Sequence, residues 1–250
     1  MRILAIESSS LVASVAIVED GVTLAEYTAN FKMTHSQTLL PMIDSMVSLF
    51  GIDLSTIDAI AVSGGPGSFT GLRIGSATAK GLAQALNIPV VSISSLEGLA
   101  ANLYGTSDLI CPIMDARRSQ VYAGIFQYEG ERLETRMEDD AIAVADLIEI
   151  LNHKGEPVIF LGDGVPVYGK LLEEGLKVPY RFAPAHMNRQ RAGAVGVLAV
   201  QYYNEGKVES SRDHKPEYLR KSQAERELLE KQNGGNYDKN YDSGRCGPGS

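Results

Sequence analysis

The sequence predicts an α/β protein built from two lobes with the same order of elements. Three short apolar runs separated by turns open the chain, and three more follow from about residue 109. After each set of three come a helix, a strand and a second helix. A repeated order of this kind indicates a duplicated lobe, each copy holding a small mixed sheet with flanking helices.

The first lobe is predicted at residues 1–105. Its opening runs RILAIES, VASVAIV and VTLAEYT form a strand meander, because each run is short, apolar and bounded by turn residues. Helical periodicity predicts helices at 35–50, 68–86 and 95–103, and buried apolar runs predict strands at 58–63 and 89–93.

The second lobe is predicted at residues 106–221 with the same order. Its three opening strands are LICPIMD, SQVYAGIFQ and ERLETR. The elements that follow are helices at about 143–151, 165–174 and 189–205, and strands at PVIFLG and 179–182. Residues 222–250 lose this periodicity and are rich in Gly, Asn, Asp and Ser, so we expect a disordered tail.

The charge distribution argues against direct RNA binding by the first lobe. The chain has a net charge of −8, and residues 1–105 contain four basic side chains against eight acidic ones. Acidic residues also outnumber basic ones at 106–220, by eighteen to fourteen. Nucleic-acid affinity needs Lys and Arg clustered against phosphates. If RNA is a ligand, we expect another chain to hold it.

The cysteines and the apolar runs indicate a cytoplasmic protein. Cys111 and Cys246 are too far apart for a zinc spacing, and two cysteines make no disulfide framework. No apolar run approaches the roughly 20 residues of a membrane span. The opening MRILAIESSS alternates apolar and polar residues, as a strand does, and does not resemble a signal peptide.

Two turns in the first lobe are candidate phosphate contacts. Glu7 and Ser9 follow the first strand in a hydroxyl-rich turn, whose backbone N–H groups can face an anion. Gly64 and Gly65 lie between a buried strand and a helix, where glycine lets a ligand approach the backbone and the helix N-terminus favours anions. The alternatives are an ordinary polar hairpin and a tight turn that only orients the helix.

Small residues recur along the predicted helix at 68–86. One row repeats every four residues from Gly67 to Ala79, and a second row lies beside it at Ala77, Gly81 and Ala85. Glycine inside a helix costs up to about 1 kcal/mol relative to alanine. Small residues on a ridge let another helix approach closely, so we predict contact with a partner chain. The alternative is close packing on the chain's own sheet.

The predicted helix at 35–50 has an apolar arc wider than that of an ordinary surface helix. Only Asp44, Ser45 and Ser48 form a polar face, which indicates burial on two sides. We therefore predict one partner surface formed by both helices. Its candidate residues are Leu39, Met42, Ile43, Met46, Phe50, Gly71, Gly75, Thr78, Ala79 and Leu82.

Other polar residues give weaker signals. His35 has no second ligand at helical spacing, so we interpret it as a capping or surface residue rather than a metal ligand. The sequence Asp115-Ala116-Arg117-Arg118 occupies the place of a second phosphate turn, but carries arginines where glycine would allow close approach. We interpret it as a tight, charged turn. No HExxH or GxSxG motif is present.

Several of these segments together resemble the TsaB (YeaZ) family. They are MRILAIESSS, Thr34-His35-Ser36, VSGGPGSFTGLRIG at 62–75, MDARRSQVYAG at 114–124 and Pro216-Glu217-Tyr218-Leu219-Arg220. The resemblance covers about residues 1–225 in order. GPGSFTGLRIG and DARRSQVY are its specific parts.

The resemblance implies the actin-like ATPase fold (ASKHA, RNase H-like) and a part in making N6-threonylcarbamoyladenosine (t6A) at position 37 of tRNAs. It implies a non-catalytic subunit that pairs through first-lobe helices with a catalytic paralogue of the TsaD family, joined by a small ATPase of the TsaE family. The paralogue's paired-histidine metal motif is absent here. We therefore expect no catalytic residue, metal or cofactor, and tRNA binding only through the complex.

Two other functions stay open at this point. An ATPase or small-molecule kinase of the same fold would place Glu7 on Mg²⁺, Gly64–Gly67 on phosphate and Asp115 as the base. A homodimer with a structural role is the third hypothesis.

Overall fold

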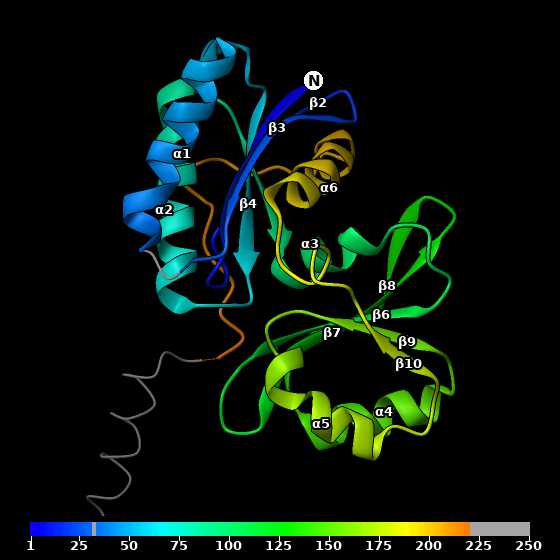
Figure 1. The fold of residues 1–250 in the computed structure, drawn as a ribbon. Helices are drawn as coiled ribbons and strands as arrows, with labels where there is room; N and C mark the ends of the chain where they lie inside the picture. The colour runs from blue at the N-terminus through cyan, green and yellow to red at the C-terminus, as the bar shows by residue number, and fades with distance from the viewer. Residues whose placement is uncertain (32–33, 221–250) are drawn as a thin grey trace, which may run out of the picture. The chain divides into compact units, whose positions relative to one another are not determined.

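The computed structural model describes residues 1–31 and 34–220 (Figure 1). Within this range Met1–Leu219 form one compact unit. The predicted tail at 222–250 lies outside the described residues. The division into lobes at 1–105 and 106–221 stays a prediction, and below we use lobe only for the elements of one sheet. None of the described helices is long and apolar enough to cross a membrane.

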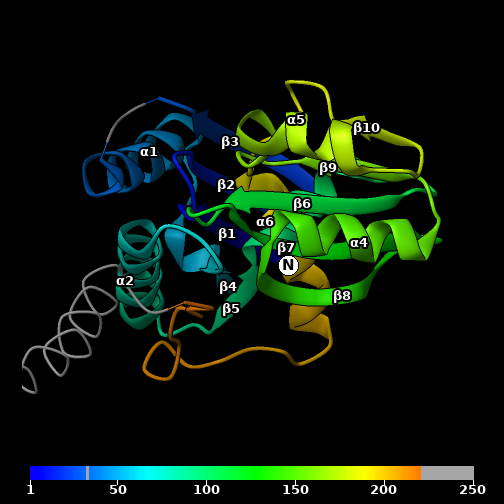
Figure 2. The same ribbon diagram turned by 90° about the horizontal axis from the view of Figure 1, so that it is seen from below.

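The first sheet has five strands in the order β3-β2-β1-β4-β5. Its strands are β1 (Arg2–Glu7), β2 (Ala13–Glu19), β3 (Val22–Ala29), β4 (Ala59–Gly65) and β5 (Val90–Ser94). The meander β1-β2-β3 is antiparallel, whereas β4 and β5 continue the sheet in parallel to β1. Helices α1 (His35–Phe50) and α2 (Phe69–Leu86) lie side by side over one face of this sheet in both Figure 1 and Figure 2.

The second sheet repeats this topology in the order β10-β9-β6-β7-β8. Its strands are β6 (Leu109–Asp115), β7 (Gln120–Glu129), β8 (Arg132–Ala143), β9 (Val158–Leu161) and β10 (Tyr180–Phe182). Again the first three strands are antiparallel and the last two run parallel to the first. Helices α4 (Val144–Lys154) and α5 (Val165–Gly175) share its core. The predicted duplication is confirmed.

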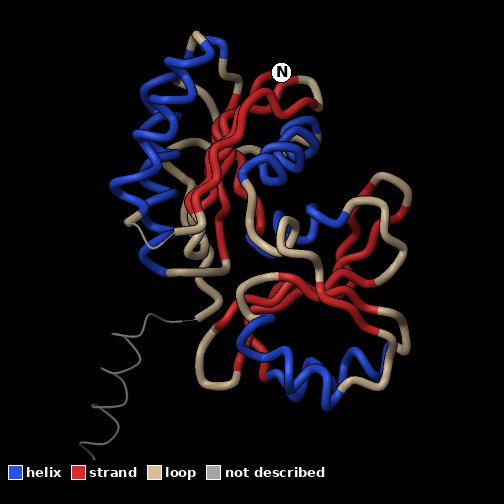
Figure 3. The backbone as a smooth tube through the Cα atoms, viewed as in Figure 1, coloured by secondary structure: helices blue, strands red, loops and turns tan. Residues whose placement is uncertain are grey.

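Each lobe ends in a helix that packs on the other lobe's sheet. Helix α3 (Ser95–Ala100) follows the first sheet, but its leucines share a core with side chains of β6, β7 and β9. Helix α6 (Ala192–Asn204) follows the second sheet and covers the free face of the first (Figure 3). The expectation that α6 completes the second lobe is wrong. Gly196 allows this approach, since a Cβ there would lie 2.5 Å from Val18 Cγ2.

Two shorter helices and a C-terminal strap complete the described chain. The 3₁₀ turns are η1 (Leu54–Thr56) and η2 (Ala101–Leu103). We call residues 207–218 the C-terminal strap. It runs back along the first sheet, where Glu209 pairs with the edge strand at Val90 through two backbone hydrogen bonds of 2.9 Å. Edge strands covered in this way are protected from pairing with other chains.

Candidate functional site: the Ser8–Ser10 turn and the paired helices

Glu7 lies at the end of β1 and is fully occupied by contacts within the chain. Its carboxylate accepts hydrogen bonds from the backbone N–H and the hydroxyl of Ser9, both at 2.6 Å, and from the Ser63 hydroxyl of β4. Only 1% of Glu7 is exposed, and this burial raises the pKa of its carboxyl group. Glu7 therefore cross-links two neighbouring strands at their ends.

The turn that follows is fixed from several elements at once. The Ser8 hydroxyl donates to the carbonyl of Gly71 in α2 at 3.0 Å, and the Ser9 carbonyl accepts from the N–H of Ser68 at 2.6 Å. The carbonyl of Ser10 lies 2.8 Å from Nε2 of His35, the first residue of α1. All three serines are buried. The turn thus joins β1 to both helices.

The first row of small residues, which starts at Gly67 in the loop before α2 and continues along that helix, faces this turn. A Cβ at Gly67 would lie 2.2 Å from the Ser9 carbonyl oxygen, and one at Gly71 would lie 2.1 Å from that of Ser8. At Gly75 it would meet the Ser8 hydroxyl at 2.2 Å. Contacts that short force atoms to move, so these glycines are required by packing inside the chain. The alternative reading of this row, internal packing, holds for Gly67, Gly71 and Gly75.

The glycines proposed for phosphate binding also have neighbours within the chain. A Cβ at Gly64 would lie 2.1 Å from the Ser92 hydroxyl, and one at Gly65 would lie 2.3 Å from the carbonyl oxygen of Glu217 in the strap. The Glu217 N–H donates to the Gly64 carbonyl at 2.7 Å. Gly64, Gly65, Glu7 and Ser9 are therefore all in contact with other parts of the chain. A working phosphate site would leave space for the ligand at these positions. Phosphate binding at this site stays a prediction, and it would require the phosphate to displace these contacts.

The predicted partner surface divides into an inner and an outer part. Leu39, Ile43, Met46, Gly71, Gly75 and Ala79 are buried in the first lobe, whereas Met42, Thr78 and Leu82 are half-buried and Phe50 is 53% exposed. Met46 is completely inaccessible. The buried members shape the helix pair from beneath, so they cannot contact a partner directly.

Both helices also carry residues that the described part of the chain leaves uncovered. On α1, Leu40 is 53% exposed and Leu49 70%. On α2, Ala77, Gly81 and Ala85 are exposed, and nothing lies within 4 Å of a Cβ built at Gly81. This is the second small-residue row of the sequence, and here no neighbour among the described residues 1–31 and 34–220 gives the glycine a steric cause. We call these five residues and Phe50 the outer face.

An aromatic and arginine cluster borders the outer face. Tyr218 of the strap stacks on Phe69 of α2, with 4.5 Å between ring centroids, and the Arg73 guanidinium lies 4.0 Å from the Phe69 ring centre. Arg73 Nε also donates to the Tyr218 hydroxyl at 3.3 Å. The sequence motifs at 62–75 and 216–220 therefore meet in space, a contact that their separation in the chain gave no sign of.

The turn between β6 and β7 is the second lobe's counterpart of Ser8–Ser10. Arg117, Arg118 and Ser119 have consecutive positive φ angles of 67°, 58° and 57°. Asp115 holds the turn by accepting from the Arg117 N–H at 2.9 Å and from the Tyr168 hydroxyl at 2.9 Å. The Arg117 side chain is 85% exposed. The expected tight, charged turn is present in a left-handed conformation.

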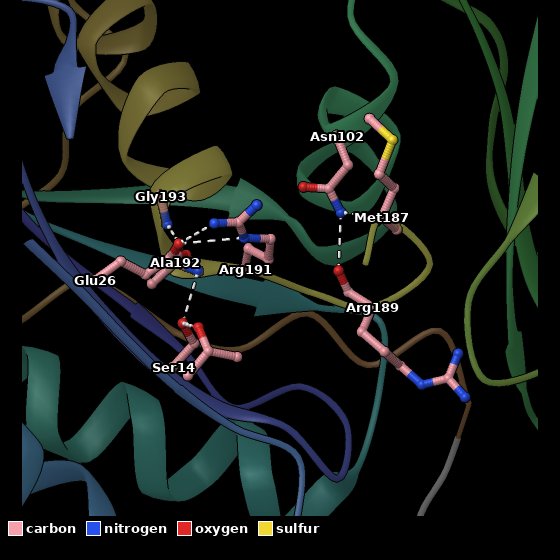
Figure 4. A network of polar contacts seen from close by, with 9 residues as sticks. Ser14, Glu26, Asn102, Met187, Arg189, Arg191, Ala192 and Gly193 are labelled. Atoms are coloured by element: carbon pink, nitrogen blue, oxygen red, sulfur yellow. Dashed lines mark hydrogen bonds and ion pairs between the residues drawn. The ribbon is translucent and has the colours of Figure 1, made fainter. Parts of the chain in front are cut away.

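A groove of about 690 Å³ lies beside the start of α6, between the β2–β3 and β7–β8 hairpins. Two of its charged residues are engaged with each other (Figure 4): the Glu26 carboxylate pairs with Arg191, and it also accepts from the Gly193 N–H at 3.0 Å. Glu26 thereby caps α6, the role that an anion takes at a helix N-terminus. Among the described residues, no group of His, Cys, Asp and Glu is arranged to hold a metal ion.

The topology defines the class of protein. Two sheets of order 3-2-1-4-5, each with an antiparallel meander and two parallel strands, are the duplicated lobes of the actin-like ATPase fold. A solved protein from Pseudomonas aeruginosa described as similar to peptidase YEAZ superposes with a TM-score of 0.77 at 28% identity, over 88% of this chain and 99% of that one. YeaZ from Pseudomonas aeruginosa gives 0.72 at 27% identity, over 87% and 99%.

Curated proteins identify the family. The chain is 36% identical to the tRNA threonylcarbamoyladenosine biosynthesis protein TsaB of Bacillus subtilis, over 93% of this chain and all of the relative. It is 29% identical to the Escherichia coli TsaB over 91% and 98%. The family model described as "TsaD: tRNA N6-adenosine threonylcarbamoyltransferase" matches residues 23–228. This chain belongs to the TsaB family.

Proposed function

We propose that this chain takes part in t6A synthesis on tRNA as the non-catalytic partner of the catalytic transferase subunit. Two relatives that match nearly the whole chain are named as t6A biosynthesis proteins. A more distant relative, 27% identical over 74% of this chain, is a tRNA N6-adenosine threonylcarbamoyltransferase of Porphyromonas gingivalis. Similarity to both supports an origin of the two subunits from a common fold.

The single observation that carries the partner role is the outer face of α1 and α2. Gly81 lies within an 18-residue helix, and no described residue comes within 4 Å of a Cβ built there, although glycine at such a position costs up to about 1 kcal/mol. Exposed Leu40 and Leu49 lie on the adjacent helix. Covering a leucine of this kind contributes about 1.5–3 kcal/mol. A helix of a partner chain would use the space over Gly81 and cover the leucine on its own side of α1, since Leu40 and Leu49 are nine residues apart and lie on opposite sides of that helix.

The same face can accept a second copy of this chain. A self-pair would use the patch twice around a two-fold axis, as isologous dimers do. We expect this homodimer to compete with the heterodimer, because both need the same surface. The small ATPase of the TsaE family would join the heterodimer. We expect tRNA to be held through the complex, since acidic side chains outnumber basic ones along the chain.

The test is a pair of arginine substitutions at helical glycines. Gly81→Arg fills the space over α2, and we expect it to abolish co-elution with the catalytic subunit. Gly169→Arg is the matched control, because Gly169 lies inside α5 and a Cβ there meets only Phe182 Cζ at 3.8 Å. Both variants gain helix propensity and are expected to fold. Substitutions at Gly75 or Met46 cannot serve, because both positions are buried in the first lobe.

The outcome separates the hypotheses. Unchanged binding by folded Gly81→Arg would place the partner surface elsewhere on the chain. Equal loss in Gly169→Arg would mean that the binding assay responds to added charge rather than to the outer face.

A further inference from the structure

His35 ties the N-terminus of α1 to the Ser8–Ser10 turn through one specific hydrogen bond. Its Nε2 lies 2.8 Å from the Ser10 carbonyl oxygen. A carbonyl oxygen only accepts, so Nε2 carries the proton. The ring also lies against α2, since a Cβ at Gly71 would approach its Cδ2 to 3.2 Å. His35 therefore sits where α1, α2 and the turn meet.

Gln190 holds the same turn from the opposite part of the chain. It lies in the segment 183–191 that leads from β10 to α6, and it is completely buried. The Ser10 hydroxyl donates to Gln190 Oε1 at 3.0 Å. Ser10 is thus held by α1 through its carbonyl group and by the segment before α6 through its side chain.

The segment that carries Gln190 is itself fixed on both sides (Figure 4). Before it, Asn102 Nδ2 donates to the carbonyl groups of Met187 and Arg189, at 3.2 and 2.8 Å. After it, the Ala192 N–H donates to the Ser14 hydroxyl of β2 at 3.0 Å. Gln190 consequently presents its amide to Ser10 from a backbone with little freedom to move.

The side chains of His35 and Gln190 each have a buried polar atom whose burial is energetically unfavourable. His35 Nδ1 and Gln190 Nε2 are buried, and neither has a hydrogen-bond partner in the described part of the chain. An unsatisfied buried polar atom is costly, and an apolar side chain of similar size would avoid that cost. The one bond that each makes to Ser10 is the feature that offsets it.

We propose that His35 and Gln190 are positioning residues which fix the Ser8–Ser10 turn and, through it, the seating of α1 beside α2. The turn that would contact phosphate in an active enzyme of this fold here organises the helix pair. Its consequence for partner binding rests on the proposed function, because α1 and α2 carry the outer face. The seating of α1 itself can be measured without any partner.

Amide hydrogen exchange of the isolated protein tests the seating. We expect His35→Ala and Gln190→Ala to speed exchange at residues 38–40 and 42 of α1 about tenfold, the size of effect that loss of one buried hydrogen bond produces; Pro41 has no amide proton. Exchange at α4 should not change. His153→Ala is the matched control, because His153 is exposed in the last turn of α4.

Two further variants separate positioning from general loss of stability. Gln at position 35 keeps a donor near the place of Nε2, so His35→Gln should restore slow exchange. The double variant His35→Ala with Gln190→Ala should exchange no faster than the more affected single variant, because both act through Ser10. The proposal would be overturned if the double variant's acceleration of α1 exchange equalled the product of the two single effects. Equal acceleration of exchange at α4 would overturn it too.

NMR of the unmodified protein is decisive even if a variant does not fold. The ring nitrogen shifts of His35 should show the proton on Nε2, with the bond to Ser10 intact; a proton on Nδ1 alone would overturn the proposal. In variants that pass the exchange test, the affinity for the catalytic subunit should fall about tenfold. If the amide exchange of α1 changes but the affinity for the catalytic subunit does not, His35 and Gln190 still position α1, but the outer face is not the partner surface.

Discussion

The Ser8–Ser10 and Asp115–Ser119 turns occupy the same place in the two lobes, after the first strand of each sheet. The first is buried and accepts or donates bonds to α1, α2 and the segment before α6. The second carries an arginine that is 85% exposed and holds three residues at positive φ. The two lobes therefore share the same strand order, but only the Ser8–Ser10 turn is buried within the protein.

The difference lies in what each turn contributes to the stability of the fold. Residues in the left-handed region cost about 1–2 kcal/mol each unless they are glycine, so Arg117, Arg118 and Ser119 are not there for stability. The serine side chains of the first turn all form hydrogen bonds within the chain.

Adding one methyl group beneath the first turn should have the largest effect. Gly71→Ala places a Cβ 2.1 Å from the Ser8 carbonyl oxygen, so we expect the free energy of unfolding to fall by about 3 kcal/mol despite the gain in helix propensity. Gly81→Ala is the control on the same helix and should stabilise by about 1 kcal/mol. Denaturant unfolding measures both. Equal signs for the two variants would show that Gly71 is not packed against the turn.

A half-buried acid that links the two lobes should make the free energy of unfolding depend on pH. Ser94, at the start of α3, donates to Asp139 of β8, and burial raises the pKa of Asp139 to about 6. The folded state therefore binds the proton more tightly than the unfolded chain, and stability is lost as pH rises through the folded pKa. We expect Asp139→Asn to stabilise the protein by about 2 kcal/mol at pH 8 and not at pH 4. Melting curves at the two pH values give the difference, and the same gain at both would exclude titration as its cause.

Relieving the strained turn in the second lobe should stabilise slightly. Ser119→Gly removes the side chain at φ 57°, and we expect a gain of about 1 kcal/mol. Ser48→Gly on the exposed side of α1 is the control and should destabilise by a similar amount. A loss of stability in Ser119→Gly would show that the serine side chain itself holds the turn, and the two turns would then be more alike than described.

Nucleotide should have the smallest effect. Because the groups of Glu7, Ser9, Gly64 and Gly65 are engaged within the chain, we expect ATP with Mg²⁺ to leave the melting temperature unchanged and the isolated protein not to hydrolyse ATP. A ligand at about 100 times its Kd would add about 2.7 kcal/mol. Such a shift, accompanied by turnover that disappears in Glu7→Ala, would favour the ATPase or kinase hypothesis and reopen the first turn as a site.

The order of elements could be predicted because it depends on local periodicity. The first helix begins and ends where its pattern predicts, at His35 and Phe50, and the second begins one residue later than expected, at Phe69. The third strand of the second lobe was predicted at ERLETR, but β8 continues to Ala143. Its extension MEDDAIA lies on an edge strand, where polar residues tolerate exposure and the strand pattern is weak.

The direction that a helix face takes could not be predicted in the same way. Spacing by four puts Gly71, Gly75 and Ala79 on one side of a helix, but the spacing is the same for a partner chain and for packing inside the first lobe. The same limit applies to α6, whose apolar and small residues fit either sheet. The positive φ of Arg117 and its neighbours had no signal, because the residues that usually mark such angles are absent.

Because α6 belongs to the end of the chain but packs on the first sheet, the first lobe cannot be completed until late in synthesis on the ribosome. One face of the first sheet, including Ile3, Ala16 and Ala61, shares its core mainly with α6, which follows α3 by about 90 residues. At about 5–20 residues per second, that face waits roughly 5–20 s for its cover. During this interval the nascent chain presents an apolar strand surface that a chaperone would shield, and release before residue 192 would leave a fragment prone to aggregation.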